Sequence, residues 1–272
     1  MPEQPMPART GRLHTQSTME ARNWIAALLL IVGAPGMSAH AQGAGNDGWG
    51  FLVEAYALFP NMKGETGVAN LPPVSVNEDP SDIFNNLQFG AMLYAEARSE
   101  TWSFSSDVLF MKLESEVAPD SQVFDGKAEV SQVGWELAAM RRLSSWFELG
   151  VAATYNKIDA DVDIVVNGFP GPIPISAGLD EDWVDPSIVM RAVVPLGEKW
   201  QFQARGNVGG FGVGSEMFYQ LQVDAVWRMS DRWQFGLGYR WIDVDYDHGG
   251  GTDRFVYDMS TFGPVLRAGF HF

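Results

Sequence analysis

The segment YRWIDVDYDHGGGTDRF, near the C-terminus, holds a dense group of side chains that can bind metals or transfer protons. Asp243, Asp245 and Asp247 alternate with other residues, as carboxylates do at the start of a calcium-binding loop. The match stops there, because His248 stands where an EF-hand needs Gly and Arg254 where it needs Glu. The three aspartates are therefore a candidate site for divalent cations of a looser kind, and solvated loop charge is the alternative.

The same residues include the chain's one candidate acid–base pair. A hydrolase needs a nucleophile or an activated water beside a base. Beyond the N-terminal region only His248 and His271 are available, and no Ser–His spacing resembles a hydrolase motif. A hydrolase that pairs Asp245 or Asp247 with His248 is the alternative, and we predict that the protein is not an enzyme. Cysteine is absent, and GGFGVGS fails the spacing of phosphate-binding loops, so we predict no cofactor.

What these residues do depends on the elements that position them, and the N-terminus gives the first constraint. MEARNWIAALLLIVGAPGMSAHAQ has an arginine, a short apolar core and the small-x-small site AHA, which is typical of a secretory signal. The apolar run is too short for a helix that spans a bilayer. We predict an extension and a cleavable Sec-type signal peptide over 1–41, and a single mature domain over 42–272. The start is either Met1 or Met19.

Charge and composition narrow the class of protein. The chain of 272 residues has a formal net charge of −16, and the predicted mature part has 15 Lys and Arg against 32 Asp and Glu, or −17. Nucleic-acid binding needs a basic face, so we predict no nucleic-acid partner. No later stretch approaches 18 consecutive apolar residues, so we predict no transmembrane helix. An exported protein of this kind is either soluble or a β-barrel.

Period-two alternation favours the barrel. WQFGLGYRW, LQFGAMLYAEAR and YQLQVDAVWR each place apolar residues on one face and polar residues or glycine on the other. Side chains alternate between the two faces of a strand, and about ten residues let a tilted strand cross a bilayer. A tryptophan follows each of the short polar turns, and tryptophan side chains favour the membrane–water boundary. The predicted interface belt comprises Trp102, Trp146, Trp200, Trp233, Trp241 and Phe272.

The pattern predicts an all-β fold, an antiparallel up-and-down transmembrane β-barrel of about ten strands, with eight as the alternative. The expected strands are 49–59, 87–98, 102–114, 127–142, 146–158, 183–195, 199–209, 216–229, 232–245 and 254–272. The connections at 99–101, 143–145, 196–198 and 229–231 are short, and those at 60–86, 115–126 and 159–182 are long. Short periplasmic turns and longer external loops are the pattern of bacterial outer-membrane barrels. In the loop at 60–86, Ser81 is a candidate cap for one helical turn that carries Ile83 and Phe84.

The last strand carries a family resemblance. FGPVLRAGFHF ends in Phe272, and a terminal phenylalanine on an amphipathic strand resembles the signal read by the barrel-assembly machinery, although Arg267 stands where that signal has glycine. GNVGGFGVGSEMFYQLQVDAVWRMSDRWQFGLGYRWIDVDYD and SDIFNNLQFGAMLYAEARSETWSF resemble small, mostly uncharacterised outer-membrane β-barrels of Gram-negative bacteria. That group resembles, more distantly, the barrel domain of outer-membrane protein A and the outer-membrane protein W family. The resemblance implies a porin-like fold in the cell outer membrane and no established reaction.

If the apolar face meets lipid, the other face fills the lumen. The predicted lumen charge network comprises Glu54, Glu96, Arg98, Asp107, Glu136, Arg191, Arg205, Asp224, Arg240 and Arg267. Barrels of eight to ten strands are narrow, and buried acids and arginines should pair. We predict a structural membrane protein with a largely plugged lumen, or a narrow passage lined by the same residues.

The expected partners are outer-membrane lipid, lipopolysaccharide and, during biogenesis, the barrel-assembly machinery. Trp241 ends the lipid-facing row of its strand, and Asp243, Asp245 and Asp247 continue the same parity. A carboxylate that faces hydrocarbon is costly, so the membrane should end before Asp243. Cations held by these aspartates would bridge to lipopolysaccharide phosphates.

Overall fold

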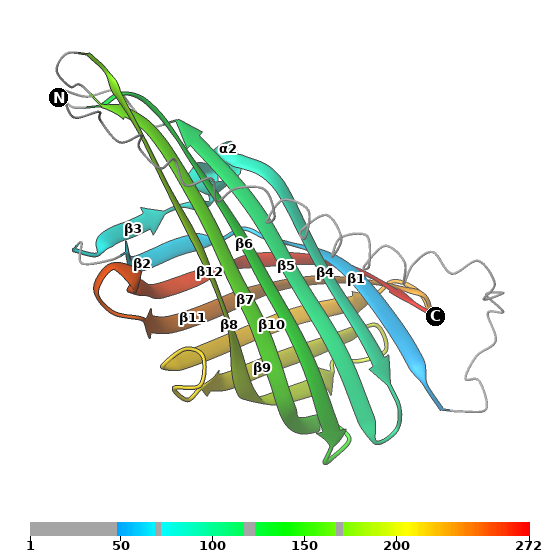
Figure 1. Cartoon of the computed structure of the whole chain (residues 1–272). Helices are drawn as coiled ribbons and strands as arrows, with labels where there is room; N and C mark the ends of the chain where they lie inside the picture. The colour runs from blue at the N-terminus through cyan, green and yellow to red at the C-terminus, as the bar shows by residue number, and fades with distance from the viewer. Residues whose placement is uncertain (1–47, 69–71, 117–122, 167–170) are drawn as a thin grey trace, which may run out of the picture. The chain divides into compact units, whose positions relative to one another are not determined.

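A computed structural model describes residues 48–68, 72–116, 123–166 and 171–272, which belong to one compact unit, Gly43–Phe272. The predicted extension and signal peptide lie outside the described residues. Nearly all of the described chain is antiparallel strand (Figure 1). Among the described residues, no helix has the length and apolar character needed to cross a membrane.

Ten strands close into a barrel, as the alternation predicts, so the count of ten is confirmed and eight is wrong. Each strand pairs with the next along the chain, and β1 pairs with β12 to close the ring, from Leu52 opposite His271 to Leu58 opposite Val265. The barrel strands are β1 (Gly50–Leu58), β4 (Leu87–Arg98), β5 (Trp102–Glu116), β6 (Val123–Arg142), β7 (Phe147–Val166), β8 (Ile173–Pro195), β9 (Trp200–Gly210), β10 (Met217–Arg228), β11 (Trp233–His248) and β12 (Phe255–His271).

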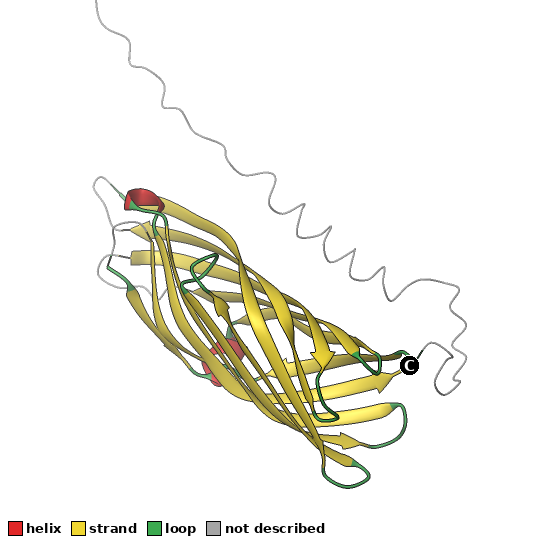
Figure 2. Ribbon diagram, turned by 90° about the horizontal axis from the view of Figure 1, so that it is seen from below, coloured by secondary structure: helices red, strands yellow, loops and turns green. Residues whose placement is uncertain are grey.

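The heights of the strands are unequal. The four short turns lie where they are predicted, but most of the predicted loop 159–182 is strand. Residues 159–166 and 173–182 belong to the upper halves of β7 and β8, which pair from Phe147 opposite Ala192 to Val166 opposite Ile173. With β6 they form a three-stranded ribbon that rises above the rest of the barrel (Figures 1 and 2). Isoleucine and valine at alternate positions on both sides of the turn explain the extension, because β-branched residues favour strands.

The first external connection is also built mainly of strands. β2 (Asn61–Val68) continues the line of β1 along the upper part of β12, and β3 (Val74–Glu78) pairs with β2. The chain bends at Phe59–Pro60 and passes close to Gly263. A side chain at position 263 would place its Cβ only 1.9 Å from the Phe59 carbonyl oxygen. Only glycine fits opposite that bend without a backbone shift.

A short helix, α2 (Pro80–Asn85), leads from β3 to β4. Its cap is Asp79 and not the predicted Ser81. The Asp79 carboxylate accepts from the backbone N–H groups of Ser81 and Asp82, and the Asp82 carboxylate accepts from the backbone N–H of Asp79 in return. Ile83 is buried, whereas Phe84 is exposed and contacts the Phe59 ring at 5.3 Å. A reciprocal box with proline at the first helical position is a stronger start signal than serine within the turn.

The remaining external turns are tight. GGFGVGS forms the hairpin between β9 and β10, where Gly210 and Gly212 adopt positive φ angles of 82° and 67°. The glycine triplet after β11 leads into a single 3-10 turn, η1 (Gly251–Asp253), before β12. Both segments serve turns, as their glycine content predicts.

Candidate functional site in the barrel lumen

The two faces of the barrel wall exchange polarity at one level. On β11, outward residues are apolar from Trp233 to Trp241 and acidic from Asp243 onward, whereas the inward residues change from Gln234 and Arg240 to apolar ones. The outward apolar row also covers eight residue steps on β5, from Trp102 to Phe110, and on β7, from Phe147 to Tyr155. Eight steps are about 27 Å along a strand, or about 20 Å across a bilayer at a tilt near 40°.

All ten residues of the predicted charge network lie on the inward face of this band. Nine are buried, and Arg98 is partly exposed at the periplasmic end. Their arrangement is layered: some contacts join distant strands, such as Glu96 on β4 with Arg191 on β8, and others join neighbouring strands, such as Glu54 on β1 with Arg267 on β12.

The layer nearest the periplasmic end centres on Arg191, whose side chain is 1% exposed. Its guanidinium forms ion pairs with Glu96 on β4 and with Glu148 on β7, and it donates to the Ser103 and Tyr94 hydroxyls at 3.0 and 3.2 Å. The partner Glu96 lies 95 residues away in sequence. Every part of the guanidinium edge therefore has an acceptor, which is what a buried arginine requires.

The same carboxylates hold a second ring of arginines at the barrel mouth. Arg98 Nε lies 2.8 Å from Glu96, and Arg98 Nη2 and Arg142 Nε each lie 3.4 Å from Glu148. Both arginines are about one-third exposed, so they border the solvent. The layer is a network of shared pairs and not a set of independent ion pairs.

Above this layer two tyrosine rings hold Arg267. Its guanidinium lies 4.9 Å from the ring centre of Tyr94 and 5.6 Å from that of Tyr56, and it pairs with Glu54. Asp224 is 3.8 Å away. The guanidinium therefore lies between two aromatic faces, where each ring attracts the cation.

The next layer consists of two further arginines and their acids. Arg240 Nη1 lies 3.1 Å from Asp107 and 3.0 Å from the Tyr56 hydroxyl, which itself donates to Asp107 at 2.6 Å. Arg205 forms an ion pair with Glu136 and donates to Ser105 at 3.3 Å. These layers place paired arginines and acids along the membrane-spanning half of the lumen.

Two of the cavities that the described residues line lie in the lumen. One of about 320 Å³ opens at the periplasmic end and is lined by residues of the Arg191 layer, with Arg228, Gln201 and His271. The second, of about 70 Å³, lies above the Asp107 layer, between Glu136 and Trp183. No residue lines both cavities, and the layers around Arg267 and Arg240 stand between them.

A cluster of buried aromatic rings, here named the aromatic cap, lies in the lumen above the second cavity. Trp183 on β8 stacks on Tyr246 on β11 with ring centres 4.2 Å apart and an interplanar angle of 18°. Phe218, Phe255 and Tyr257 pack in the same buried cluster. The stack joins β8 to β11, which are separated in the sheet by β9 and β10.

Asp185 positions the cap, and the alternation of polarity did not single it out. Its fully buried carboxylate accepts from the Trp183 indole N–H at 2.9 Å, the Asn156 amide at 3.0 Å, and the Ser215 backbone N–H and hydroxyl, both at 2.7 Å. These bonds tie the β9–β10 turn to β8. One signal in the sequence could have found Asp185: it lies six residues before Arg191 on the same strand, so both side chains face the lumen.

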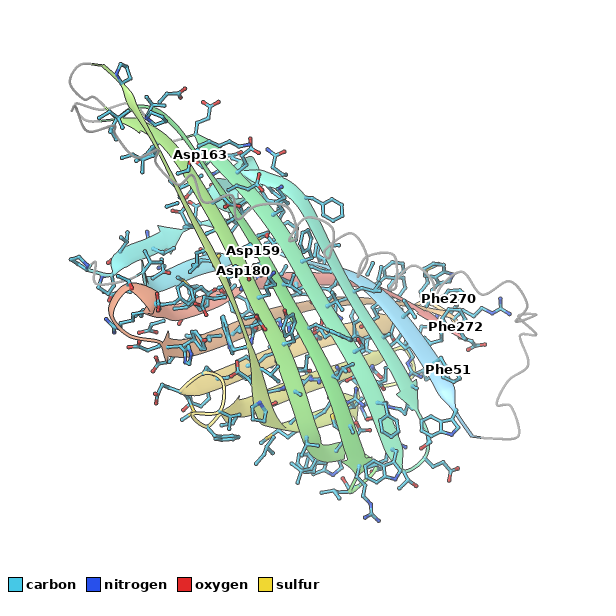
Figure 3. All side chains as sticks on the ribbon, viewed as in Figure 1. Phe51, Asp159, Asp163, Asp180, Phe270 and Phe272 are labelled. Carbon is cyan, nitrogen blue, oxygen red and sulfur yellow. The ribbon has the colours of Figure 1, made fainter. Side chains whose placement is uncertain are left out.

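The predicted interface residues lie on the outer surface. All six are exposed, from 43% for Trp102 to 72% for Phe272. Trp102, Trp146, Trp200 and Trp233 lie at the periplasmic turns, where Phe51, Phe270 and Phe272 are also placed (Figure 3). Trp241 lies at the other border and contacts Phe262 at 5.4 Å.

The three aspartates of β11 lie above the apolar band, on the outward face. Asp245 is directly opposite Asp258 on β12, which is opposite Glu65 on β2, so three carboxylates form a row. Asp247 pairs with Arg254, and Asp243 accepts from Ser260. In the described ranges no group of three or more His, Asp or Glu side chains is gathered as a metal ion would require.

The candidate acid–base pair is not brought together. Asp245 and Asp247 point outward, whereas His248 has the opposite parity and lies beside the Tyr246 ring at 6.0 Å. The Asp247 carboxylate is engaged by two Arg254 nitrogens at 3.0 and 2.6 Å.

Comparisons with known proteins concern the fold alone. No family model and no curated protein matches the chain. Among solved structures, the chain is similar to the Pseudomonas putida toluene transporter TodX, with 11% identity, a TM-score of 0.34, and coverage of 84% of this chain and 91% of that one. It is also similar to the attachment invasion locus protein Ail of Yersinia pestis, with 9% identity, a TM-score of 0.33 and coverage of 83% and 99%. Its similarity to Neisserial surface protein A has 13% identity, a TM-score of 0.28, and coverage of 84% of this chain and 98% of that one.

Proposed function

We propose that this chain is an integral outer-membrane β-barrel with a sealed lumen, which serves as a structural membrane protein and not as an open pore. The observation that carries the proposal is the exchange of polarity at Trp241. Below it the outward face is apolar and the inward face charged, as in a barrel surrounded by lipid. Above it the outward face is charged, as in a segment surrounded by water.

The lipid-facing band supports the location. Many large apolar side chains are about half exposed on the barrel exterior, including Leu237 at 61% and Val151 at 64%. A soluble protein rarely exposes so much contiguous apolar surface. Export by a Sec-type signal, contact with lipopolysaccharide, insertion by the barrel-assembly machinery and kinship with the outer-membrane protein A and W groups are parts of the same proposal.

The sealed lumen is supported by closure at two heights. Arginine–carboxylate layers close the membrane-spanning half, and the stack of Trp183 on Tyr246 closes the outer half. Paired buried charges are costly to separate, so the layers resist opening.

A narrow passage is the second candidate. It is favoured by one observation, namely that the cavities of about 320 and 70 Å³ lie on either side of the layers that hold Arg267 and Arg240. A rearrangement of these two side chains would join the cavities. A hydrolase has no such support, because the carboxylates of Asp245 and Asp247 and the His248 ring lie on opposite faces.

Fractionation and solute uptake test the proposal. The protein is expected in the outer-membrane fraction, where the folded barrel should migrate differently on electrophoresis before and after boiling. Liposomes that contain it should not swell in small sugars, in contrast to liposomes that contain an open porin. Recovery from the soluble periplasm would overturn the location, and swelling would favour the passage. His248→Ala tests the hydrolase: equal hydrolysis of lipid and peptide substrates by both proteins would remove it.

A further inference from the structure

Above the membrane band, the ribbon of β6, β7 and β8 has a charged outward face and an apolar inward face, the reverse of the arrangement below. Its outward face carries Lys157, Asp159 and Asp161 on β7, with Asp180 and Asp182 on β8. Figure 3 shows Asp159, Asp163 and Asp180 along these raised strands. The opposite face, which continues the inward face of the barrel, is apolar. It comprises Ala128, Val130, Ile158, Ala160, Val162, Ile164, Val166, Ile173, Ile175, Ala177 and Leu179.

This apolar face is a single surface in register. Ile164 lies opposite Ile175, and Val162 lies between Ala177 on one side and Ala128 on the other. Ile173 and Ile175 are each 46% exposed. From Leu179 to Ile173 the face is about 20 Å tall, at about 3.3 Å per residue.

A second apolar lip meets the first at its base. On the β2–β3 hairpin, Val74 and Val76 have the same parity, and Val74 is 66% exposed. Val76, Met62 and Leu179 all pack against the cluster that contains Trp183 and Tyr246. The two lips therefore rise from one apolar floor, which is the aromatic cap.

Neither lip stands in the bilayer, because the outward faces at this height are acidic and an anionic surface is excluded from hydrocarbon. The apolar inner faces are thus water-exposed surfaces outside the membrane. Exposed apolar surface of this extent on a water-facing segment marks a binding site.

We propose that the outer mouth of this barrel, floored by Trp183 and Tyr246 and walled by the apolar faces of β7–β8 and β2–β3, binds an elongated apolar molecule with a neutral or cationic head group. The depth of the walls suits an extended chain, and the floor offers two stacked aromatic rings. Glu181, half-buried on the inner face, and the aspartates on the outer faces surround the mouth with negative charge. That field attracts cations and repels anions.

The same charges argue against other occupants. A second copy would bring another acidic ribbon against this one, in a chain whose net charge is −16. An anionic amphiphile would place its head group among carboxylates, where like charges cost free energy. The inference holds whether or not the lumen conducts, because the floor lies above the charged layers.

The full chain in lipid nanodiscs gives a direct test, with photoreactive dodecyl probes that carry a trimethylammonium or a sulfate head. After irradiation, the peptides that carry adducts are identified by mass spectrometry. The cationic probe should label 173–183 and 74–78 at least about fivefold more than the sulfate probe at low salt, a preference that salt should reduce. Labelling of the outward band reports partition into lipid and serves as the internal reference.

Matched variants on the two faces of β8 complete the test. Ile175→Asn on the inner face should lower labelling of 173–183 several-fold, whereas Ser176→Asn on the outer face should leave it unchanged. Heat-modifiable migration confirms that both variants are folded. Labelling confined to the lipid-facing band, equal labelling by the two probes, or equal effects of the two variants would overturn the proposal. A dimer in solution that excludes both probes from the mouth would also overturn it.

Discussion

Arg191 shows why the charged residues of the lumen act as a set. It is buried, it lies between two carboxylates from different strands, and those carboxylates also hold Arg98 and Arg142. A charge network of this kind contributes little net stability when complete, but it is costly to break, because a lone buried charge has lost its hydration without a partner.

The Arg191→Met variant should therefore be strongly destabilised. It leaves Glu96 and Glu148 without their central partner, and we expect a loss of about 3 kcal/mol in the free energy of unfolding. Urea unfolding in lipid vesicles measures this loss. The triple variant with Glu96→Gln and Glu148→Gln should recover most of it, and Arg254→Met, which breaks an exposed pair, should change little. Equal effects of Arg191→Met and Arg254→Met would contradict this account of the lumen.

Asp245 shows the opposite situation, because its charged neighbours among the described residues are other carboxylates. Burial raises its pKa, and the neighbouring Asp258 and Glu216 carboxylates raise it further. Because the folded state holds this proton more tightly than the unfolded chain, the ionised carboxylate destabilises the fold at pH values above its folded pKa. The effect disappears as the pH falls below the usual aspartate value.

Asp258→Asn should consequently raise the thermal midpoint at pH 8, and the gain should shrink toward pH 4 and in high salt. Thermal unfolding followed by circular dichroism across this pH range checks the sign. Asp231→Asn, in a periplasmic turn, removes the same formal charge away from the row and should give no comparable gain. A gain that persists at pH 4 would exclude carboxylate repulsion as its cause.

The alternation of odd and even positions along each strand was sufficient to assign residues to the lumen. It was not sufficient to predict which of these residues pair. Alternation placed Glu96 and Arg191 on the inward face, since that needs only the period of a strand. Their contact depends on barrel closure and on register between distant strands, which a single sequence does not encode locally. The tyrosines Tyr56 and Tyr94 were not predicted as members of the network, although the alternation places Tyr94 on the polar face, because phenol rings suit either face.

At the scale of elements, the turn of the β9–β10 hairpin lies beyond the last residue pair between β8 and β9. Side-chain hydrogen bonds to β8 hold this turn in place. Asp185 on β8 accepts two hydrogen bonds from Ser215 in the turn. The hairpin is the lowest part of the wall, and this anchor keeps the turn under the aromatic cap.

Asp185→Ala should loosen the turn and the cap together. It leaves buried donors of Ser215, Trp183 and Asn156 without an acceptor, at roughly 1–3 kcal/mol for each group that water cannot reach. Hydrogen exchange at 211–216 should accelerate, while exchange in β4 and β5 stays near its original rate. Asp182→Ala, on the outward face of the same strand, is the matched control. Unchanged exchange at the turn in Asp185→Ala would contradict the anchoring role.

The raised strands mark the limit of the sequence prediction at this scale. Proline and glycine near 168–172 and aspartates from 159 to 163 indicated a loop. The structure instead continues β7 and β8, because the apolar residues between those aspartates pair across the hairpin. The inward row of Ile242, Val244 and Tyr246 between the β11 aspartates was the readable signal of an apolar interior, and it lies in the segment that first suggested a metal site.

At the scale of the whole molecule, the exchange of polarity at one level is the property that a membrane imposes. The apolar band extends over the same eight residue steps on β5, β7 and β11. Unrelated strands share this span because a slab of hydrocarbon of one thickness surrounds them all.

Leu237→Arg tests that slab. Leu237 is 61% exposed and lies midway between Trp233 and Trp241. In lipid vesicles the arginine should cost about 2–4 kcal/mol of folding free energy, because it faces the bilayer midplane. On a water-facing surface the same change stays within about 0.5 kcal/mol. Asp161→Arg, on the outward face above the band, is the control, and equal effects of the two changes would contradict the proposed band.

The central claim is that two layers of different chemistry seal the lumen, and single-channel recording in planar bilayers tests it most directly. The wild-type protein should give no discrete conductance steps. Replacing Arg191, Arg267 and Arg240 of the charged layers by serine, together with Trp183 and Tyr246 of the aromatic cap, removes both closures and should produce steps, which shows that inserted protein is detected. Discrete steps from the wild-type protein at the same amounts would contradict the sealed lumen and establish the narrow passage in its place.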